Sequence, residues 1–407
     1  MSVRDKMTAA FASAEGGLFT QVEKADVGSK YIELQKQGIT FMGWADPFMP
    51  DRSMPEFVAD AYIEALRNSG AEHYTAPIGN RDLKVMLAEK LKKHNSLDVD
   101  PDRNILITPG SDSGLFFAII PFIGKDDEVI IPCPSYPNNF LVVEMLGGVP
   151  VPVELKEENG YQLDVPAIRE KVTDRTKMVL LTHPNNPTTA VYNRHSLEEL
   201  RELVIEKDLI LVVDQAFEDF TFGNEMITPA SMEGMFERTV TVFSFSKGMG
   251  LSGLRVGYIV ADDVIMDSMF ANAVAVIGAT STAAQHAVMA ALKDPSFMKD
   301  FEKAYEYRRH KAYEILNSIP GVSCLLPQSG FLCWLDVSGI GDSTEITAYL
   351  LRNAGVSVND GKNYGKGGEG HLRIVLGVYA DDAKVVAALE RIAEVLKRYP
   401  AKQTGCL

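Results

Sequence analysis

Short apolar runs that resemble β-strands alternate with amphipathic, helix-like stretches along most of this chain. The strand candidates are NILITPG, DEVIIPCPSY, MVLLTHP, LILVVDQAF, TVTVFSFS and VGYIVA. This alternation is typical of a mostly parallel sheet that is covered by helices on both faces. Each of the first five runs ends in a turn with Gly, Pro, Asn, Asp or Ser. Because open parallel sheets bind ligands at the carboxyl ends of their strands, we expect the functional side chains at these turns.

The length and texture of the chain predict two packed domains. It has 407 residues, of which 46% are hydrophobic, too many for one simple core. A helical stretch at residues 294–317 separates the sheet region from a segment with short strand-like runs and a closing helix. We predict an α/β fold with a large domain at 46–290, which holds a mostly parallel, seven-stranded-type sheet. A smaller α+β domain follows at 291–407, and residues 1–45 pack back on it.

The charge of the chain argues against a nucleic-acid partner. A net charge of −15 repels phosphates unless a basic patch is strongly localised, and the sequence has no such patch. No apolar run reaches membrane-spanning length, and the start of the chain lacks the apolar core of a secretion signal. The four cysteines form no CxxC pair and have no zinc spacing. We therefore expect a cytoplasmic protein with reduced thiols, no metal site and no membrane partner.

The most informative segment is SFSKGMGLSGLRVGY, residues 244–258. Lys247 directly follows a strand candidate and sits among Ser and Gly in an apolar context, where lysine is unusual. Taken alone, a lysine that caps a strand end is the commoner case. Gly248, Gly250 and Gly253 have GxGxxG spacing. A dinucleotide fingerprint needs a helix after the glycines and an acidic residue beyond it, whereas another strand candidate follows here, so we reject that interpretation.

Asp214 ends the strand candidate LILVVD, one strand before Lys247, so its carboxylate can face the same site. A carboxylate beside a pyridine nitrogen keeps that nitrogen protonated, which makes the ring an electron sink for a carbanion at a substrate α-carbon. Arg255 offers a planar guanidinium, and the turn at Gly110 offers backbone amides at a helix start. Both features indicate a bound anion such as a phosphate.

Two further side chains follow strand candidates. Asn186, in THPNNPTTA, can donate through its amide to a phenolic oxygen, and Tyr136, in PCPSYPNNF, can stack on an aromatic ring. Taken alone, a turn is the more common role for Asn186, and core packing for Tyr136. Each motif is weak by itself, and the combination carries the argument.

The order of these motifs resembles the class I and II aminotransferases of the aspartate aminotransferase superfamily, which are pyridoxal 5′-phosphate (PLP) enzymes of fold type I. A glycine turn after a strand, PSY, NNPT, D-x-A-aromatic, S-x-S-K with an arginine eight residues further on, and a late LRI follow one another in that order. The resemblance implies that Lys247 forms the Schiff base with PLP. It also implies cofactor contacts from Asp214 to the pyridine nitrogen, from Asn186 to the phenolic oxygen, from Tyr136 to the ring, and from Arg255 and Ser244 to the phosphate.

The same resemblance implies substrate contacts and a partner. Arg373, in HLRIVLG, corresponds to the arginine that takes the substrate α-carboxylate. Gly43, in FMGWADP, corresponds to the glycine beside the substrate, where Asn186 also lies. Tyr74, in HYTAPIGNRDLK, corresponds to the tyrosine that reaches the phosphate of the neighbouring subunit's cofactor, which implies a homodimer with shared sites.

The chain departs from the family pattern at three positions. Phe217 stands where the family usually has tyrosine, so a hydroxyl donor to the phenolic oxygen is missing. Asp112 stands where a Ser or Thr often contacts the phosphate, and a carboxylate there is repulsive unless it points away or is protonated. We keep both as candidate cofactor contacts and expect Ser111 and backbone amides to hold the phosphate. Thr189 replaces a glycine, which suggests a slightly different backbone under Asn186.

The expected reaction is a ping-pong transfer of an amino group from an amino acid to a 2-oxo acid, with Lys247 as general base in both halves. A lyase or decarboxylase of the same fold uses the same kind of site, and the motifs do not separate these activities. A non-catalytic PLP-fold binding protein is the alternative from another class. The intact set of lysine, aspartate and arginines weighs against it.

A missing arginine bears on the charge of the substrate. Family members that prefer dicarboxylic amino acids often carry an arginine in the stretch between Tyr258 and Gln285, and this chain has no Lys or Arg there. A second substrate carboxylate entering from that side would be desolvated without a cation to pair with. We therefore expect a neutral amino donor, with Phe217, Trp44 and Phe48 as candidate apolar contacts.

Overall fold

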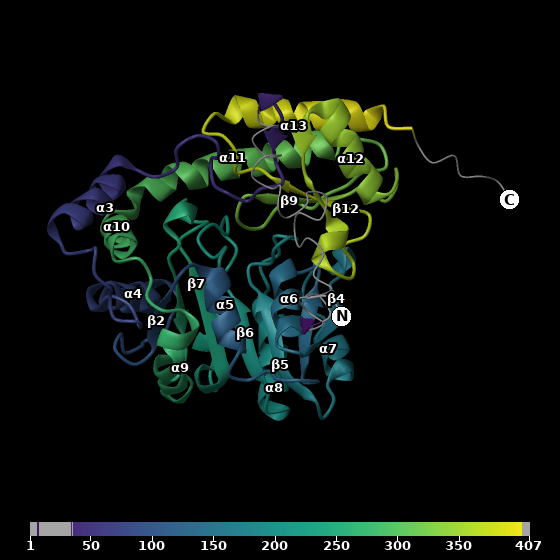
Figure 1. The fold of residues 1–407 in the computed structure, drawn as a ribbon. Coiled ribbons are helices and arrows are strands. Elements are labelled where there is room, and N and C mark those ends of the chain that lie inside the picture. The colour runs from purple at the N-terminus through teal and green to yellow at the C-terminus, as the bar shows by residue number, and fades with distance from the viewer. Residues whose placement is uncertain (1–5, 8–33, 35, 401–407) are drawn as a thin grey trace.

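The fold was analysed in a computed structural model, which describes residues 6, 7, 34 and 36–400. At its centre is a seven-stranded sheet with the order β2-β8-β7-β6-β5-β3-β4 (Figure 1). β8 is antiparallel to both of its neighbours, and the other pairs are parallel. The strands are β2 (Ile105–Thr108), β3 (Glu128–Cys133), β4 (Val149–Glu154), β5 (Thr176–Thr182), β6 (Ile210–Asp214), β7 (Thr239–Ser244) and β8 (Gly257–Val260).

The mostly parallel sheet is confirmed, and all six strand candidates form strands in it. The sequence analysis did not predict β4, whose sequence is VPVPVE. Proline lacks the N–H group that a central strand donates, so two prolines argue against a strand. β4 is tolerated because it lies at the edge of the sheet, beside β3 only.

Helices cover both faces of the sheet, since alternate residues of a buried strand point to opposite sides. In β3, Val129 and Ile131 pack with side chains of α5, α6 and α9, whereas Ile130 packs with side chains of α7 and α8. Figure 1 shows the sheet between these helices. The helices are α5 (Ser111–Ile119), α6 (Pro137–Met145), α7 (Val165–Lys171), α8 (Arg194–Glu206) and α9 (Asp263–Val276).

Three more helices pack near β2 and β8. They are α3 (Glu56–Asn68), α4 (Arg81–His94) and α10 (Thr282–Lys293), and α10 packs against both α3 and α4. Side chains accept hydrogen bonds from the first backbone N–H groups of several helices, which fixes where these helices begin. These capping residues are Asn80 for α4, Asn193 for α8, Asp262 for α9 and Ser281 for α10.

The C-terminal part forms a second packed unit above the large sheet, made of a small sheet and three helices. An antiparallel sheet of order β11-β12-β9 is built from β9 (Leu332–Asp336), β11 (Asn359–Asp360) and β12 (His371–Val375). It shares one apolar core with α11 (Met298–Leu316), α12 (Ser343–Ala354) and α13 (Asp382–Lys397). Of all helices in the described ranges, none is long and apolar enough to span a membrane.

The predicted domain bounds of 1–45, 46–290 and 291–407 remain predictions. The limit at residue 290 falls inside α10, and most of residues 1–45 lie outside the described residues. Within that segment, β1 (Thr40–Phe41) pairs in parallel with β10 (Val356–Ser357). Arg391 of α13 also donates to Oγ1 of Thr40 at 3.0 Å. The described end of the N-terminal segment therefore contacts C-terminal elements.

Candidate active site

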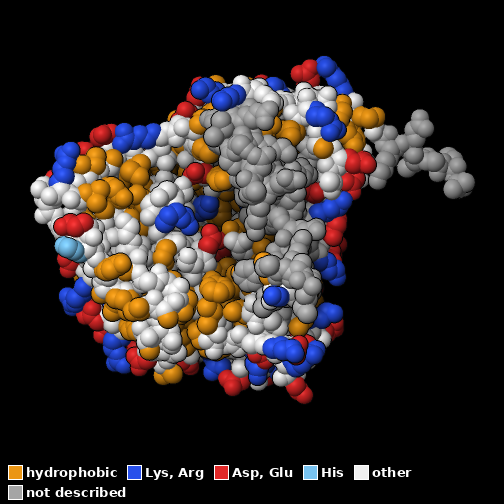
Figure 2. Space-filling model, viewed as in Figure 1, with side chains coloured by type: hydrophobic (Ala, Val, Ile, Leu, Met, Phe, Trp, Pro, Cys, Tyr) orange, Lys and Arg blue, Asp and Glu red, His pale blue; other side chains and the backbone are white. Residues whose placement is uncertain are grey.

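One cavity of about 450 Å³ opens between the large sheet and the C-terminal elements. Its walls come from the turns after β2, β3, β5, β6 and β7, from β11 and β12, and from the segment that follows β1. Figure 2 shows charged side chains of both signs close together beside a central hollow. The prediction that functional side chains gather at the carboxyl ends of the parallel strands thus matches the position of this cavity.

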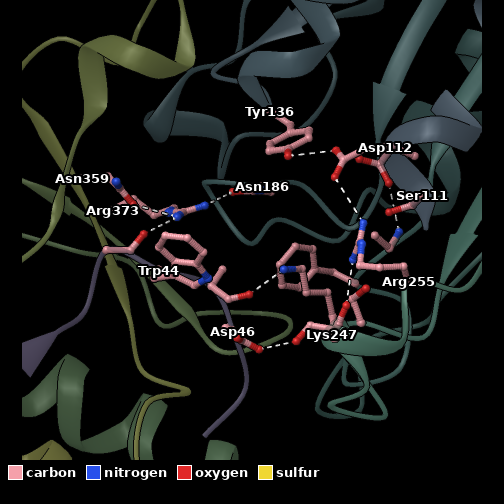
Figure 3. Close-up of a pocket in the computed structure, with 18 residues that line it drawn as sticks. Trp44, Asp46, Ser111, Asp112, Tyr136, Asn186, Lys247, Arg255, Asn359 and Arg373 are labelled. Carbon is pink, nitrogen blue, oxygen red and sulfur yellow. Dashed lines mark hydrogen bonds and ion pairs between the residues drawn. The ribbon is translucent and has the colours of Figure 1, made fainter. Parts of the chain in front are cut away.

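Lys247 lies in the floor of the cavity, three residues after β7 ends (Figure 3). Its Nζ donates to the backbone oxygen of Ala45 at 2.5 Å and lies 5.9 Å from the centre of the Phe217 ring. Burial, together with the positive charge of Arg373, lowers the pKa of this amine to about 8. At neutral to mildly basic pH a substantial fraction of the amine is therefore neutral, which is the form that attacks carbonyl carbons and accepts protons.

Asp214 ends β6, the parallel neighbour of β7, and is 7% exposed. Its Oδ1 accepts a hydrogen bond from the backbone N–H of Ala216 at 3.2 Å, and no side chain within the described ranges donates to it. Burial, together with the nearby Asp112 carboxylate, raises the pKa of Asp214 to about 7. This carboxylate therefore lacks a strong donor, which a protonated ring nitrogen of a ligand would supply.

Arg255 lies against the first turn of α5, where a phosphate is expected. The space is so tight that a Cβ atom on Gly110 would lie 2.3 Å from Nη2 of Arg255. Gly110 also has φ 82°, a conformation that favours glycine. Nη1 of Arg255 donates to the backbone oxygen of Ser252 at 2.8 Å, and Ser111 of α5 lines the same part of the cavity. Guanidinium and helix N-terminus together form a cradle for an anion.

Asp112 also lies in the first turn of α5, and one oxygen of its carboxylate is held by Tyr136 and Asn138. Its Oδ1 accepts hydrogen bonds from the Tyr136 hydroxyl and from Nδ2 of Asn138, each at 3.0 Å. Its Oδ2 lies 3.9 Å from Nη2 of Arg255 (Figure 3). Burial raises the pKa of Tyr136, and the Asp112 carboxylate raises it further, so this hydroxyl stays protonated and donates.

Arg373 lies at the other end of the cavity and is 3% exposed. Its Nη1 donates to Oδ1 of Asn186 at 3.2 Å, and its Nη2 donates to the Gly43 oxygen at 2.9 Å and to Oδ1 of Asn359 at 2.7 Å. Its Nε is buried without a hydrogen-bond partner. These acceptors are neutral, and no carboxylate in the described part of the chain forms an ion pair with Arg373. A buried cation of this kind fits an anionic substrate group.

The backbone under Asn186 is glycine-like despite the threonine. Thr189 has φ 66°, in the left-handed region that glycine favours. Its Oγ1 accepts from the backbone N–H of Gln328 at 3.2 Å, and its backbone oxygen accepts from Ser329 at 2.8 Å. Contacts with the C-terminal region therefore accompany this conformation. The slightly different backbone that we expected under Asn186, relative to the family, remains a prediction.

Most predicted site residues line this one cavity, and a few do not. The lining residues among them are Gly43, Trp44, Ser111, Asp112, Tyr136, Asn186, Asp214, Phe217, Lys247, Arg255 and Arg373. Ser244 lies outside the lining and accepts a hydrogen bond from the backbone N–H of Ser246, which does line it. Tyr74 points into solvent at 96% exposure. Phe48 is buried and stacks on Tyr305, with ring centres 5.4 Å apart.

The sequence analysis missed four polar residues of the cavity: Asp46, Ser246, Ser252 and Asn359. The Ser252 hydroxyl donates to Oδ1 of Asp46. Ser252 lies between Lys247 and Arg255 in the chain, and that position was an available signal. Asp46 and Asn359 had none, because one follows β1 and the other meets Arg373 only through the pairing of β11 with β12.

The fold and this cavity define the class of protein: a PLP-dependent transferase with a large α/β part and a smaller C-terminal part. Residues 45–392 match the family model of class I and II aminotransferases, and the chain belongs to that family. The cofactor of this class is PLP. The resemblance seen in the sequence motifs is confirmed.

Relatives and solved structures agree with this assignment. The chain is 33% identical to an aspartate aminotransferase of Musicola paradisiaca over 356 residues, which cover 86% of this chain and 88% of the relative. It is 32% identical to aromatic-amino-acid aminotransferase 2 of Thermococcus litoralis, covering 89% and 92% of the two chains. The structure of an aspartate aminotransferase from Thermus thermophilus with maleate matches with a TM-score of 0.83 and 30% identity, covering 97% and 99%.

The donors of the cavity fit PLP. The cofactor presents a phosphate, a basic ring nitrogen and an aldehyde carbon, and the cavity offers an anion cradle at Arg255, a buried carboxylate at Asp214 and a partly neutral amine at Lys247. Among the described residues, the hydrogen bonds of these three groups are to or from the backbone, and the nearest opposite charge in an ion pair with any of them is the Asp112 carboxylate, 3.9 Å from Arg255. The fit therefore rests on groups whose charge and hydrogen-bonding character complement those of the ligand.

Proposed function

We propose that Lys247 is the covalent anchor of PLP and the group that carries the proton in both halves of the amino transfer. The observation that carries the proposal is its amine, buried in the cavity with its pKa lowered to about 8. A neutral amine both forms an imine and takes a proton from carbon, so one residue serves both roles. When bound, PLP supplies the electron sink that makes the α-proton of an amino acid acidic.

Other residues hold and polarise the cofactor in this proposal. Asp214 pairs with the ring nitrogen, and its buried carboxylate supports that role. Arg255 and Ser111, with the backbone N–H groups of α5, hold the phosphate. Tyr136 stacks on the ring, and Asn186 donates to the phenolic oxygen through the amide nitrogen that Arg373 does not contact.

Phe217 and Ser244 contribute less directly. The Phe217 ring packs near the Lys247 amine and is pressed against Gly330, where a Cβ atom would lie 2.8 Å from the ring. This packing confines the lysine side chain without donating a hydrogen bond. Ser244 supports the phosphate end of the cavity through Ser246. Its hydroxyl accepts a hydrogen bond from the backbone N–H of Ser246 at 3.1 Å.

Arg373 takes the α-carboxylate of the substrate in this proposal, beside Gly43 and Asn186. Support comes from its burial and from the absence of a carboxylate partner within the described residues. Its three neutral acceptors hold the guanidinium in place without neutralising it. A planar carboxylate then gains two charge-assisted hydrogen bonds.

We propose a neutral amino donor. Once Arg373, Arg255 and Lys247 have these roles, no other cation lines the cavity among the described residues, whereas Asp46 and Asp112 remain. The stretch between Tyr258 and Gln285 also lacks Lys and Arg. Trp44 lies beside Arg373 and offers an apolar wall (Figure 3). Comparing kcat/KM for aspartate and glutamate with alanine, methionine and phenylalanine tests this, and a clear preference for the acidic pair would refute it.

We also propose a cytoplasmic homodimer in which Tyr74 reaches the neighbouring site. Tyr74 is almost fully exposed, and Phe57, Ile63 and Leu66 of the preceding helix α3 are also exposed. Figure 2 shows hydrophobic side chains gathered on the part of this face where α3 and α10 lie in Figure 1. Such a patch fits a protein interface. The free cysteines Cys133, Cys324 and Cys333 fit a reducing compartment. Light scattering of the purified protein tests the dimer.

Half-reactions test the activity and its rivals. The PLP-loaded protein is mixed with one amino acid at a time, the cofactor absorbance is followed, and products are identified by mass spectrometry. Amino transfer gives the 2-oxo acid of the donor and an aminated cofactor. Release of carbon dioxide or of an eliminated side-chain group would point to the decarboxylase or lyase alternative. An unchanged spectrum with all common amino acids would favour the non-catalytic binding protein.

A further inference from the structure

Asn138 forms a closed triangle of hydrogen bonds with Asp112 and Tyr136. Its Nδ2 donates to Oδ1 of Asp112 and to the Tyr136 hydroxyl, each at 3.0 Å, and that hydroxyl donates to the same Asp112 oxygen at 3.0 Å. Asn138 lies in the first turn of α6 and does not line the cavity. Its side chain therefore acts on the site through Asp112 and Tyr136.

The triangle determines which partner the Asp112 carboxylate has. Both donors meet Oδ1, while Oδ2 stays 3.9 Å from Nη2 of Arg255, too far for a hydrogen bond. About half of each side chain in this pair is exposed, 49% for Arg255 and 51% for Asp112. Asp112 thus has room to turn toward Arg255, and the two donors hold it back.

Arg255 has one fixed hydrogen-bond partner, and an anion and Asp112 can compete for its other donors. Nη1 donates to the Ser252 oxygen, and the whole group is confined against Gly110. Its remaining donors face the cavity, where Asp112 is the nearest carboxylate. An anion bound at Arg255 therefore competes with Asp112 for the same guanidinium.

We propose that Asn138 is a positioning residue that keeps Asp112 on Tyr136, so that Arg255 stays free for the phosphate of the cofactor. This inference rests on the proposed role of Arg255. Asp112 is then a built-in competitor of the phosphate, and the Asn138–Tyr136 pair restrains it. Wild type therefore binds PLP less tightly than a variant without the Asp112 charge does. Freeing the Asp112 carboxylate to turn toward Arg255 weakens PLP binding further.

A double-mutant cycle tests the proposal. The cofactor-free full-length protein is titrated with PLP, and the dissociation constant is measured from the cofactor absorbance for wild type, Asp112→Asn, Asn138→Ala and the double variant. A half-exposed charge pair contributes about 1 kcal/mol, which corresponds to about a fivefold change in affinity. Asp112→Asn should therefore bind PLP about fivefold more tightly, and Asn138→Ala about fivefold more weakly.

The decisive comparison is the effect of Asn138→Ala in the Asp112→Asn background. It should fall to less than about twofold, because no charge remains to be released. Equal weakening by Asn138→Ala in both backgrounds would show a merely structural role and overturn the inference. So would an Asp112→Asn variant that binds PLP no more tightly than wild type.

Two further measurements keep the proposal testable if one variant of the cycle fails to fold. Tyr136→Phe keeps the ring but removes the other donor to Asp112, so it should weaken PLP binding in the wild-type background and not in Asp112→Asn. Inorganic phosphate, used as a competitor of PLP, should bind Asp112→Asn more tightly than wild type. If wild type does not bind PLP at all, the proposed function itself fails, which separates that outcome from a failure of the cycle.

Discussion

Replacing Asp214 by Asn should stabilise the cofactor-free protein at pH 8, although it removes a residue that the proposed function needs. Burial raises the pKa of this carboxyl from 3.8 to about 7. The folded state therefore holds the proton more tightly than the unfolded state does. Stability that depends on this proton is fully present below pH 3.8 and is lost as the pH rises through 7.

The size of the effect follows from the shift. A difference of about 3 pH units corresponds to about 4 kcal/mol at ~1.4 kcal/mol per unit, which is an upper limit because the amide must also be buried. We expect a gain of about 2 to 4 kcal/mol in the free energy of unfolding for Asp214→Asn at pH 8, and little change at pH 4. Added PLP should stabilise wild type more than the variant, since the ring nitrogen pairs with the carboxylate only in wild type.

Urea unfolding of the cofactor-free protein between pH 4 and pH 8 measures this directly. Glu128→Gln is a matched control with the opposite sign. Hydrogen bonds from Thr173 and Arg175 lower the pKa of Glu128, so its contribution is present above its ordinary pKa and is lost as the pH falls. If wild type and Asp214→Asn have the same pH dependence over this range, the buried, unpaired carboxylate is not the cause and the reasoning is wrong.

Three further expectations concern the site. Lys247→Ala should abolish amino transfer in a protein that still folds, and turnover at the wild-type rate would refute the proposed anchor. Arg373→Ala should lower kcat/KM for many α-amino acids alike, by about 10- to 100-fold, because charge-assisted bonds to the α-carboxylate are lost; a loss confined to one amino acid would point to a side-chain contact. Gly110→Ala should weaken PLP binding more than tenfold, since its Cβ would lie 2.3 Å from Arg255, whereas Gly124→Ala, in the loop between α5 and β3, meets no atom closer than 3.7 Å and serves as the control. Equal PLP affinities of the two glycine variants would contradict the anion cradle.

The site residues that follow the ends of the strands were predictable from the sequence. Asp214, Asn186, Tyr136 and Lys247 each come within a few residues of the end of a buried strand, and parallel strands bring such residues to one edge of the sheet. Six of the seven strands of the sheet followed from the same apolar runs. β4 was missed because its prolines are compatible only with an edge strand.

The other site residues are placed by contacts between segments that lie far apart in the sequence. Asn359 meets Arg373 because β11 pairs antiparallel with β12 in a register that places these two residues opposite each other. Asp46 reaches the cavity because the chain after β1 crosses from the C-terminal elements to the turn that holds Ser252. The sequence left two states open for Asp112, turned away or protonated. The structure shows the side chain turned toward Tyr136.

The most direct test of the account is to identify the residue that carries the cofactor. The PLP-loaded protein is treated with borohydride, which reduces an imine to a stable amine, and is then digested and sequenced by mass spectrometry. The account predicts one modified peptide that contains SFSKGMGL, with the pyridoxyl phosphate group on Lys247. A label on another lysine, or no covalent label in a protein that transfers amino groups, would contradict it.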